Sequence, residues 1–311
     1  MDKHNNLKLK SFGRFSLFLD ENDPGISKTL IRPKFFKKWH REPEFMDIIE
    51  SEVNKGDVVF DLGANIGYVT MFLASFVGSH GKVFAVEPSP HNFDILMKNI
   101  NHNNFSKRID AYQLAISSFT GKQDFNIAAE TNLNSFAFTK HTKSTISVKT
   151  STIDDFFNDK PFPNFIKMDI EGGEVDALDG MRKTLENLKS PLKVLIEIHP
   201  MYYEENNFRK QLLRLFNLGF KTKYLISAGT DTPEYFSKRN YKPTKIYTTG
   251  DWRRGIYEGV TNEHVLESCS SLFNDHYVNI NWFSILKNPK RFFNRRVPSP
   301  KIVRAIMIQK N

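Results

Sequence analysis

The chain has a single cysteine, Cys269, among its 311 residues, so no disulfide can form within it. That usage is typical of a reducing compartment. The first residues, 1–6, lack the basic start and apolar core of a signal peptide, and no run of residues approaches the apolar length that spans a bilayer. These absences predict a soluble, cytoplasmic protein. A hydrophobic content of 40% is ample for one large α/β domain with additions.

The chain has fewer acidic residues (35) than basic residues (44), and its formal net charge is +9. Basic proteins often meet nucleic acid or anionic surfaces. Part of the excess lies in one segment near the C-terminus, at Lys287, Lys290, Arg291, Arg295 and Arg296. Two interpretations of this basic stretch stay open, a solvated face or a contact with an anionic surface. No signature of an RNA-binding module is visible.

The most informative pattern is a short apolar run at 58–60 that ends in Asp61 and is followed by two glycines, Gly63 and Gly67, which open a helical pattern. Glycine lets the backbone turn tightly and lets a ligand approach the main chain. A second strand-like run at 82–86 ends in Glu87. A carboxylate at that position can accept hydrogen bonds from both hydroxyls of a ribose. The pattern predicts an adenosine-containing cofactor at the carboxyl edge of a parallel sheet.

Two cofactors are candidates for this pattern, a dinucleotide and S-adenosylmethionine. A dinucleotide requires the spacing G-x-G-x-x-G for its pyrophosphate, and the segment Gly63-Ala64-Asn65-Ile66-Gly67 lacks the middle glycine. Asp61 would repel a pyrophosphate, but it suits the positively charged amino end of methionine, and Asn65 adds an amide donor or acceptor. The pattern therefore favours S-adenosylmethionine over NAD. A glycine-rich turn that binds nothing is the remaining alternative.

The run from Asp61 to Tyr68 resembles the first motif of the FkbM family of S-adenosylmethionine-dependent methyltransferases. The likeness covers roughly residues 40–230, and Gly173 stands where that family usually has alanine. Further blocks follow in the family's order: Ala85-Val86-Glu87-Pro88 with Asn92, Ala115-Ile116-Ser117 with Gly121, Thr152-Ile153-Asp154-Asp155-Phe156, Ile166-Lys167-Met168-Asp169-Ile170-Glu171-Gly172-Gly173-Glu174, and Glu197-Ile198-His199-Pro200.

The alternation of strand and helix patterns predicts a parallel sheet with helices on both faces. The resemblance implies a Rossmann-like class I methyltransferase fold, with a mostly parallel seven-stranded sheet and an antiparallel last strand. We predict an N-terminal cap and helix at 1–54 and a methyltransferase core at 55–228, with a hairpin inserted at 122–150. An insertion at 229–300 then separates strand six from a last strand at 301–311. A parallel sixth strand ends on the ligand side, so we expect the insertion to cover the acceptor.

Acidic residues and one histidine follow two neighbouring strands. Asp169 and Glu171 end strand four, and Glu197 and His199 end strand five. A hydroxyl acceptor needs a base or a metal to remove its proton. We predict His199 as the general base, oriented by Glu197, with Asp169 beside them. Asp169 and Glu171 could instead hold Mg²⁺, which we do not favour because no third oxygen ligand is fixed by the spacing.

The predicted cofactor-binding residues lie in three of the matched blocks. They are Asp61, Gly63, Asn65, Gly67, Glu87, Ile116 and Ser117, and we expect the last two to border the adenine.

The predicted function is O-methylation, from S-adenosylmethionine, of a hydroxyl on a sugar, glycan or natural product, as the resemblance implies. A nucleic-acid methyltransferase is one alternative, but Asp169-Ile170-Glu171-Gly172 is acidic where a flipped base would stack. A non-catalytic cofactor-binding protein is another. A dehydrogenase would need the missing glycine.

Overall fold

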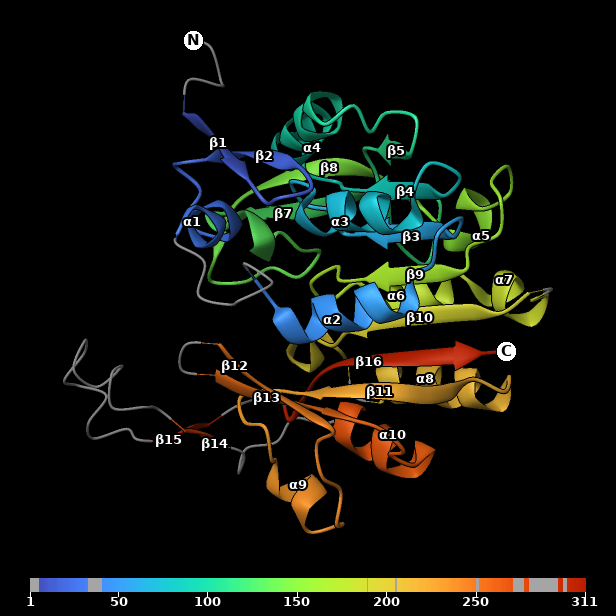
Figure 1. The fold of residues 1–311 in the computed structure, drawn as a ribbon. Coiled ribbons are helices and arrows are strands. Elements are labelled where there is room, and N and C mark those ends of the chain that lie inside the picture. The colour runs from blue at the N-terminus through green and yellow to red at the C-terminus, as the bar shows by residue number, and fades with distance from the viewer. Residues whose placement is uncertain are drawn as a thin grey trace.

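The computed structural model describes residues 6–32, 41–188, 190–204, 206–249, 252–270, 277–279, 296–298 and 301–311. Its centre is a nine-stranded sheet in the order β12-β13-β11-β16-β10-β9-β3-β4-β5 (Figure 1). In chain order these strands are β3 (Val58–Leu62), β4 (Lys82–Val86), β5 (Ile109–Tyr112), β9 (Phe165–Met168), β10 (Leu192–Glu197), β11 (Lys221–Ser227), β12 (Lys245–Thr249), β13 (Trp252–Tyr257) and β16 (Val303–Lys310).

The middle of the sheet is parallel. β3 pairs in parallel with β4 and β9, β4 with β5, and β9 with β10. β16 lies between β10 and β11 and runs antiparallel to both, as predicted for the last strand. Parallel strands end at the same edge, so the residues that follow β3, β4, β9 and β10 come together there.

The sheet is wider than the predicted seven strands. β13 pairs antiparallel with β11, and β12 pairs antiparallel with β13, so the insertion after β11 extends the sheet at that side. The sequence did not show these strands because their segments, KIYTT and WRRGIY, lack the regular alternation of apolar and polar residues that marks a strand.

Helices cover both faces of the sheet, as predicted. One face packs against α2 (Pro43–Glu52), α3 (Tyr68–Val77) and α4 (Pro90–His102), and the other against α6 (Glu174–Asp179), α8 (Asn207–Asn217) and α10 (Asn262–Ser270). Figure 1 shows α2 and α3 in front of the sheet and α6 and α8 behind it. The strands are buried almost throughout, which explains their continuous apolar runs.

Smaller elements surround this core. The N-terminal segment forms β1 (Leu7–Ser11), β2 (Ser16–Asp20) and α1 (Ile26–Ile31). The segment predicted as a hairpin at 122–150 contains β7 (Gly121–Ala128) and β8 (Thr142–Ser151), which pair antiparallel, and β6 (Ala115–Ile116) joins β8. The remaining elements are η1 (Thr131–Leu133), α5 (Ile153–Phe156), α7 (Arg182–Glu186), η2 (Pro200–Tyr202), α9 (Glu234–Ser237), β14 (Tyr277–Asn279) and β15 (Arg296–Pro298).

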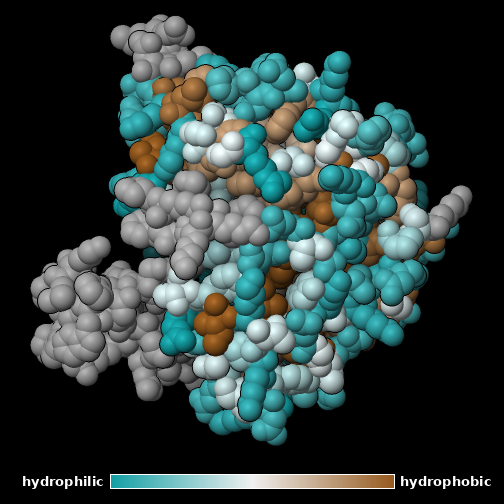
Figure 2. Space-filling view, in the orientation of Figure 1, coloured by the Kyte–Doolittle hydropathy of each residue, from teal (hydrophilic) through white to brown (hydrophobic). Residues whose placement is uncertain are grey.

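The helices offer no candidate for a membrane span in the part of the chain that the structure describes. None of its helices has both the length and the apolar character needed to cross a bilayer. The face drawn in Figure 2 is mostly hydrophilic, with hydrophobic residues in small separate groups. Of the predicted basic stretch, Lys287, Lys290, Arg291 and Arg295 lie outside the described residues.

Candidate active site

A cavity with about 960 Å³ of empty space, its open mouth included, lies at the carboxyl edge of the parallel strands. The lining includes residues that follow four neighbouring strands, namely Gly63, Ala64 and Asn65 after β3, Glu87 and Pro88 after β4, Asp169, Ile170 and Glu171 after β9, and Glu197 at the end of β10.

The glycine loop after β3 packs closely against the rest of the site. Gly63 has a φ of +82°, and a Cβ added there would lie 1.9 Å from the carbonyl oxygen of Asp169. The amides of Gly63 and Ala64 both donate to the carbonyl oxygen of Val86, so the loop is fixed to the end of β4. Gly67, with a φ of +96°, is the N-cap of α3. A side chain at Gly63 is therefore excluded by both backbone conformation and space.

Glu87 lies at the position predicted for a ribose-binding carboxylate. Its Oε2 accepts a hydrogen bond from the Asn65 amide and its Oε1 from the Ser89 amide, each at 2.9 Å. The residue is only 4% exposed but lines the cavity. Burial raises the pKa of Glu87 to about 7, although the hydrogen bonds act in the opposite direction. The carboxyl group is thus oriented by the backbone and turned toward the cavity.

Asp61 is fully buried and is not part of the cavity lining. Its Oδ2 accepts a 2.6 Å hydrogen bond from the Thr70 hydroxyl, and its Oδ1 lies 3.1 Å from Lys167 Nζ. Lys167 also donates to the carbonyl oxygen of Gly63 at 2.7 Å. Direct contact between Asp61 and the amino end of methionine remains a prediction. The geometry favours an indirect role, in which Asp61 and Lys167 hold the glycine loop in place.

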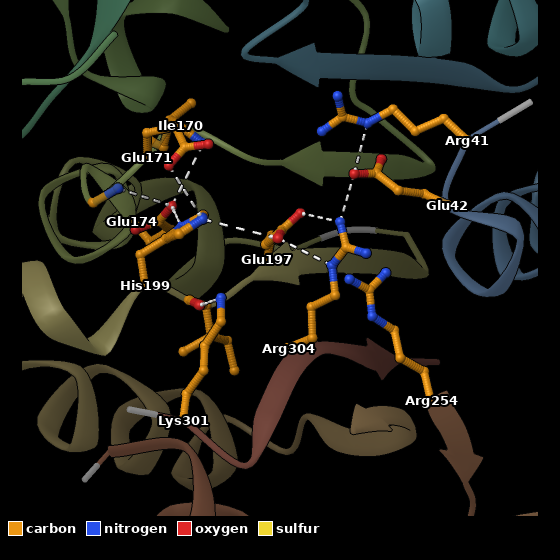
Figure 3. A network of polar contacts seen from close by, with 12 residues as sticks. Arg41, Glu42, Ile170, Glu171, Glu174, Glu197, His199, Arg254, Lys301 and Arg304 are labelled. Atoms are coloured by element: carbon orange, nitrogen blue, oxygen red, sulfur yellow. Dashed lines mark hydrogen bonds and ion pairs between the residues drawn. The ribbon is translucent and has the colours of Figure 1, made fainter. Parts of the chain in front are cut away.

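The residues after β9 and β10 form a cluster around the imidazole of His199 (Figure 3). Nδ1 of His199 lies 2.9 Å from Glu174 Oε1 and Nε2 lies 3.4 Å from Glu171 Oε2, whereas Glu197 Oε1 is 3.9 Å from Nε2. Glu174 is also the acceptor for the Tyr203 hydroxyl at 2.9 Å. The residue placed to orient His199 is therefore Glu174 rather than the predicted Glu197.

Glu197 instead pairs with Arg304 of the last strand. Arg304 donates from Nε to Glu197 Oε1 at 3.0 Å and from Nη2 to Glu197 Oε2 at 3.2 Å. It also donates to Glu44 at 2.7 Å and to Glu42 at 2.6 Å. Arg304 is 5% exposed, and Glu44 and Glu197 are buried with it, whereas Glu42 is partly exposed. The sequence did not indicate this cluster of one arginine and three glutamates, because residues 197 and 304 are far apart in the chain.

Residues 61–224, just over half of the chain, match the family model described as the methyltransferase FkbM domain. The chain belongs to the FkbM methyltransferase family. This confirms the resemblance seen in the sequence, and together with the strand order it confirms the predicted class I methyltransferase fold.

One curated relative of this FkbM-family chain is the hexuronic acid methyltransferase AglP of Haloferax volcanii. The two are 29% identical over 163 residues, which cover 51% of this chain and 62% of the relative. The match thus spans less than two thirds of that relative's length.

Two solved structures also match, at lower identity. The methyltransferase FkbM of Methylobacillus flagellatus KT is 20% identical with a TM-score of 0.41, and the match covers 65% of this chain and 43% of that one. The S-adenosylmethionine-dependent O-methyltransferase of Thermotoga maritima is 15% identical with a TM-score of 0.40, and the match covers 90% and 67%. At these TM-scores neither likeness supports a further conclusion.

Three titrating groups of the FkbM-family site have raised pKa values, for different physical reasons. Burial alone would lower the pKa of His199, but the charges of Glu174 and Glu171 outweigh it and raise the pKa to about 9. Burial raises the pKa of Glu171 to about 8, and burial together with Glu197 raises that of Asp169 to about 6. His199 therefore holds a proton at neutral pH, whereas Asp169 lines the cavity and titrates close to neutrality.

Asp169, Glu171 and His199 could also hold a metal ion, because one ligand atom from each lies within 4.8 Å of the others. Two carboxylates and an imidazole suit a transition metal better than Mg²⁺, which prefers oxygen ligands. Both imidazole nitrogens already face carboxylates, at 2.9 Å and 3.4 Å. Mg²⁺ at Asp169 and Glu171 stays a prediction that this arrangement does not favour.

The remaining predicted residues differ in their access to the cavity. Ile116 lines it together with Phe125 and Phe136, which gives an apolar wall suited to an adenine ring. Ser117 is fully buried and is not part of the lining, and its hydroxyl donates to Gln123 at 3.3 Å.

The insertion was expected to cover the acceptor. Within the parts of 229–300 that the structure describes, no residue lines the cavity. The loop between β7 and β8 does so instead, through Thr131, Asn132, Asn134 and Phe136. The carbonyl oxygen of Thr131 accepts hydrogen bonds from the side chains of Asn65 and Asn92, which ties this loop to the glycine loop and to α4.

Proposed function

We propose that this protein transfers a methyl group from S-adenosylmethionine to a hydroxyl oxygen of a saccharide. The carrying observation is that one cavity brings together the glycine loop, Glu87 and the carboxylate of Asp169. The first two are suited to a nucleoside, and the third is suited to accept a proton. The choice of a saccharide rests on the similarity to a hexuronic acid methyltransferase.

The residues of the cavity have separable roles in this proposal. S-adenosylmethionine supplies an electrophilic methyl group on a sulfonium. Glu87 accepts hydrogen bonds from the ribose hydroxyls, and the wall around Ile116 and Phe125 receives the adenine. Asp169 takes the proton from the acceptor hydroxyl, because its pKa of about 6 leaves it ionised and still basic near neutral pH.

His199 acts behind Asp169 and Glu171 in this arrangement. With its pKa near 9, the imidazolium places a positive charge beside the two carboxylates and stabilises their ionised forms. We therefore assign the proton-accepting role to Asp169 rather than to His199, which the sequence favoured. His199 and Glu197 become residues that position and polarise the proton acceptor.

The cavity does not suit a nucleic acid. Five acidic residues line it, Glu42, Glu87, Asp169, Glu171 and Glu197, against two basic residues, Arg41 and Lys167. A polyphosphate backbone at this opening would meet mainly negative charge. We also keep the cytoplasm as the proposed location, on the single cysteine.

The first test is binding of S-adenosylhomocysteine by calorimetry, comparing wild type with Glu87→Gln and with the exposed control Glu186→Gln. At pH 8, above the Glu87 pKa of about 7, loss of a charged acceptor for the ribose should weaken binding about 10- to 100-fold in the first variant only. A wild type that binds no S-adenosylhomocysteine would refute cofactor binding.

The second test is transfer from labelled S-adenosylmethionine to a panel that contains methyl glucosides, methyl glucuronides, nucleotide sugars and a short RNA. We expect label in a saccharide and none in RNA. Asp169→Asn should lower the rate about 100-fold or more while S-adenosylhomocysteine still binds. Label only in RNA would contradict the proposed acceptor class.

A further inference from the structure

Arg41 differs from the other charged side chains of the cavity, because part of its guanidinium is unused. Nε donates to Glu42 Oε1 at 2.9 Å, whereas Nη1 and Nη2 have no hydrogen bond to any residue that the structure describes. The side chain lines the cavity and is 25% exposed. In Figure 3 the two terminal nitrogens point away from Glu42 and Arg304.

Nearly all the other charged groups of the lining have partners within the protein. Among the residues that the structure describes, Asp169 is the exception, and its role is proposed above. The partnered groups are Lys167 with Asp61, Glu42 and Glu197 with Arg304, Glu171 with His199, and Glu87 with the amides of Asn65 and Ser89. Within the lining that the structure describes, Arg41 is thus the positively charged residue that still has N–H donors available for a ligand.

The position of Arg41 is fixed by its surroundings. Glu42, the residue that pairs with it, is the N-cap of α2 with a φ of +50° and accepts a 2.6 Å hydrogen bond from Arg304. The amide of Arg41 donates to the Tyr68 hydroxyl at 3.3 Å. A guanidinium held in this way loses little conformational freedom when it binds a ligand.

We propose that Arg41 is the carboxylate-binding group of the cavity. An arginine with two open donors matches the two oxygens of a carboxylate, whereas a neutral hydroxyl would use only one of them. Two sources of a carboxylate fit the proposed function, on which this inference rests. One is the methionine end of S-adenosylmethionine, and the other is an acidic sugar acceptor of the kind named for the Haloferax volcanii relative.

The experiment separates the two sources with two ratios. The first compares the dissociation constants of S-adenosylhomocysteine and 5′-methylthioadenosine, which lacks the amino-acid portion. The second compares transfer to methyl β-D-glucuronide with transfer to methyl β-D-glucoside. Both are measured for wild type, Arg41→Gln, Arg41→Lys and the control Arg209→Gln, an exposed arginine on α8.

If the carboxylate belongs to the cofactor, Arg41→Gln shrinks the first ratio about 10- to 100-fold, because only S-adenosylhomocysteine loses a charge-assisted pair. If it belongs to the acceptor, the first ratio stays constant and the preference for the glucuronide falls by the same factor. Arg41→Lys keeps the positive charge but loses the planar pair of N–H donors, so the affected ratio should lie between those of wild type and Arg41→Gln. Arg209→Gln should change neither ratio.

The proposal is overturned if both ratios stay within about twofold of wild type in Arg41→Gln and in Arg41→Lys, with melting temperatures that show folded protein. If wild type methylates neither sugar, the first ratio alone decides. Failure of the proposed function gives a different result, since wild type would then bind neither S-adenosylhomocysteine nor 5′-methylthioadenosine.

Discussion

Arg304 offers the sharpest test of the buried charges beside the site, and we expect Arg304→Met to destabilise the protein strongly. The guanidinium donates four hydrogen bonds, two to Glu197 and one each to Glu42 and Glu44. Methionine fills much of the same space and supplies none of these bonds. The variant therefore leaves three buried carboxylates with less positive charge.

The magnitude follows from the partners that remain. Glu42 keeps Arg41 and Glu44 keeps Arg254, but Glu197 loses both of its hydrogen bonds from Arg304. Removing one partner of a buried ion pair typically costs about 3–5 kcal/mol, because the other charge stays uncompensated. We expect a loss of this size in the free energy of unfolding at pH 8, measured by urea titration with circular dichroism.

The loss should depend on pH in a definite direction. In the wild type the charges of Arg41 and Arg304 overcome burial and lower the pKa of Glu42 to about 2, and Arg304 also lowers that of Glu197. These lowered pKa values contribute stability that is present above the unfolded value of 4.5 and is lost as the pH falls toward 2. Without Arg304, the burial of Glu197 is opposed by less positive charge and its pKa rises, whereas Glu42 keeps the charge of Arg41. We therefore expect the Glu197 carboxyl group to take up a proton between pH 8 and pH 5. The penalty of Arg304→Met should therefore shrink across that range.

Two comparisons make the result interpretable. Arg182→Met removes an exposed pair with Asp179 and should cost less than about 1 kcal/mol. The double variant Arg304→Met/Glu197→Gln removes the stranded carboxylate and should recover part of the loss. A loss below about 1 kcal/mol for Arg304→Met, or the same loss at pH 5 and pH 8, would refute the reasoning.

Three further predictions concern the site itself. Gly63→Ala should abolish S-adenosylhomocysteine binding in calorimetry, because its Cβ would lie 1.9 Å from the Asp169 carbonyl oxygen. The control Gly13→Ala has a similar φ but nothing within 4 Å of the added Cβ, so it should bind S-adenosylhomocysteine normally. Equal affinities of the two variants would contradict the close packing at Gly63. Glu174→Gln should lower the pKa of His199 from about 9 in an NMR titration, since it removes the largest charge that raises it, and an unchanged titration would show that Glu174 is not its main partner. Methyl transfer should persist in excess chelator; inactivation that a divalent ion reverses would instead support a metal at the histidine–carboxylate cluster.

Much of the cofactor side of the site follows from the sequence, because local rules fix it. The order of strand, glycine pair, helix, strand and Glu87 determines where the loop and the carboxylate lie relative to each other, and the structure places both at the cavity. The role of Asp61 could not be judged in the same way. Its partner, Lys167, comes from a neighbouring strand about 100 residues later, and nothing in the spacing shows that the two side chains meet.

The histidine cluster shows a different limit. Glu197 and His199 are two residues apart, so the alternation of a strand suggested that they share a face. The strand ends at Glu197, and the backbone of His199 departs from the extended conformation as η2 begins. The side chain then meets Glu174, at the buried start of α6, in place of Glu197. The signal available in the sequence was Glu174 itself, an acidic residue in the first turn of a helix that starts at this edge of the sheet.

The last strand explains why a residue near the end of the chain belongs to the site. The parallel strands bring their carboxyl ends to the cavity, but β16 runs antiparallel to β10, so it contributes its beginning. Lys301 and Arg304 therefore lie beside the tip of β10, where Lys301 donates to the carbonyl oxygen of Ile198 and Arg304 to Glu197. Glu197, although it is paired with Arg304, adds to the burial that raises the pKa of Asp169 to about 6. The antiparallel strand thus supplies the positive charge that keeps this acidic edge of the sheet stable.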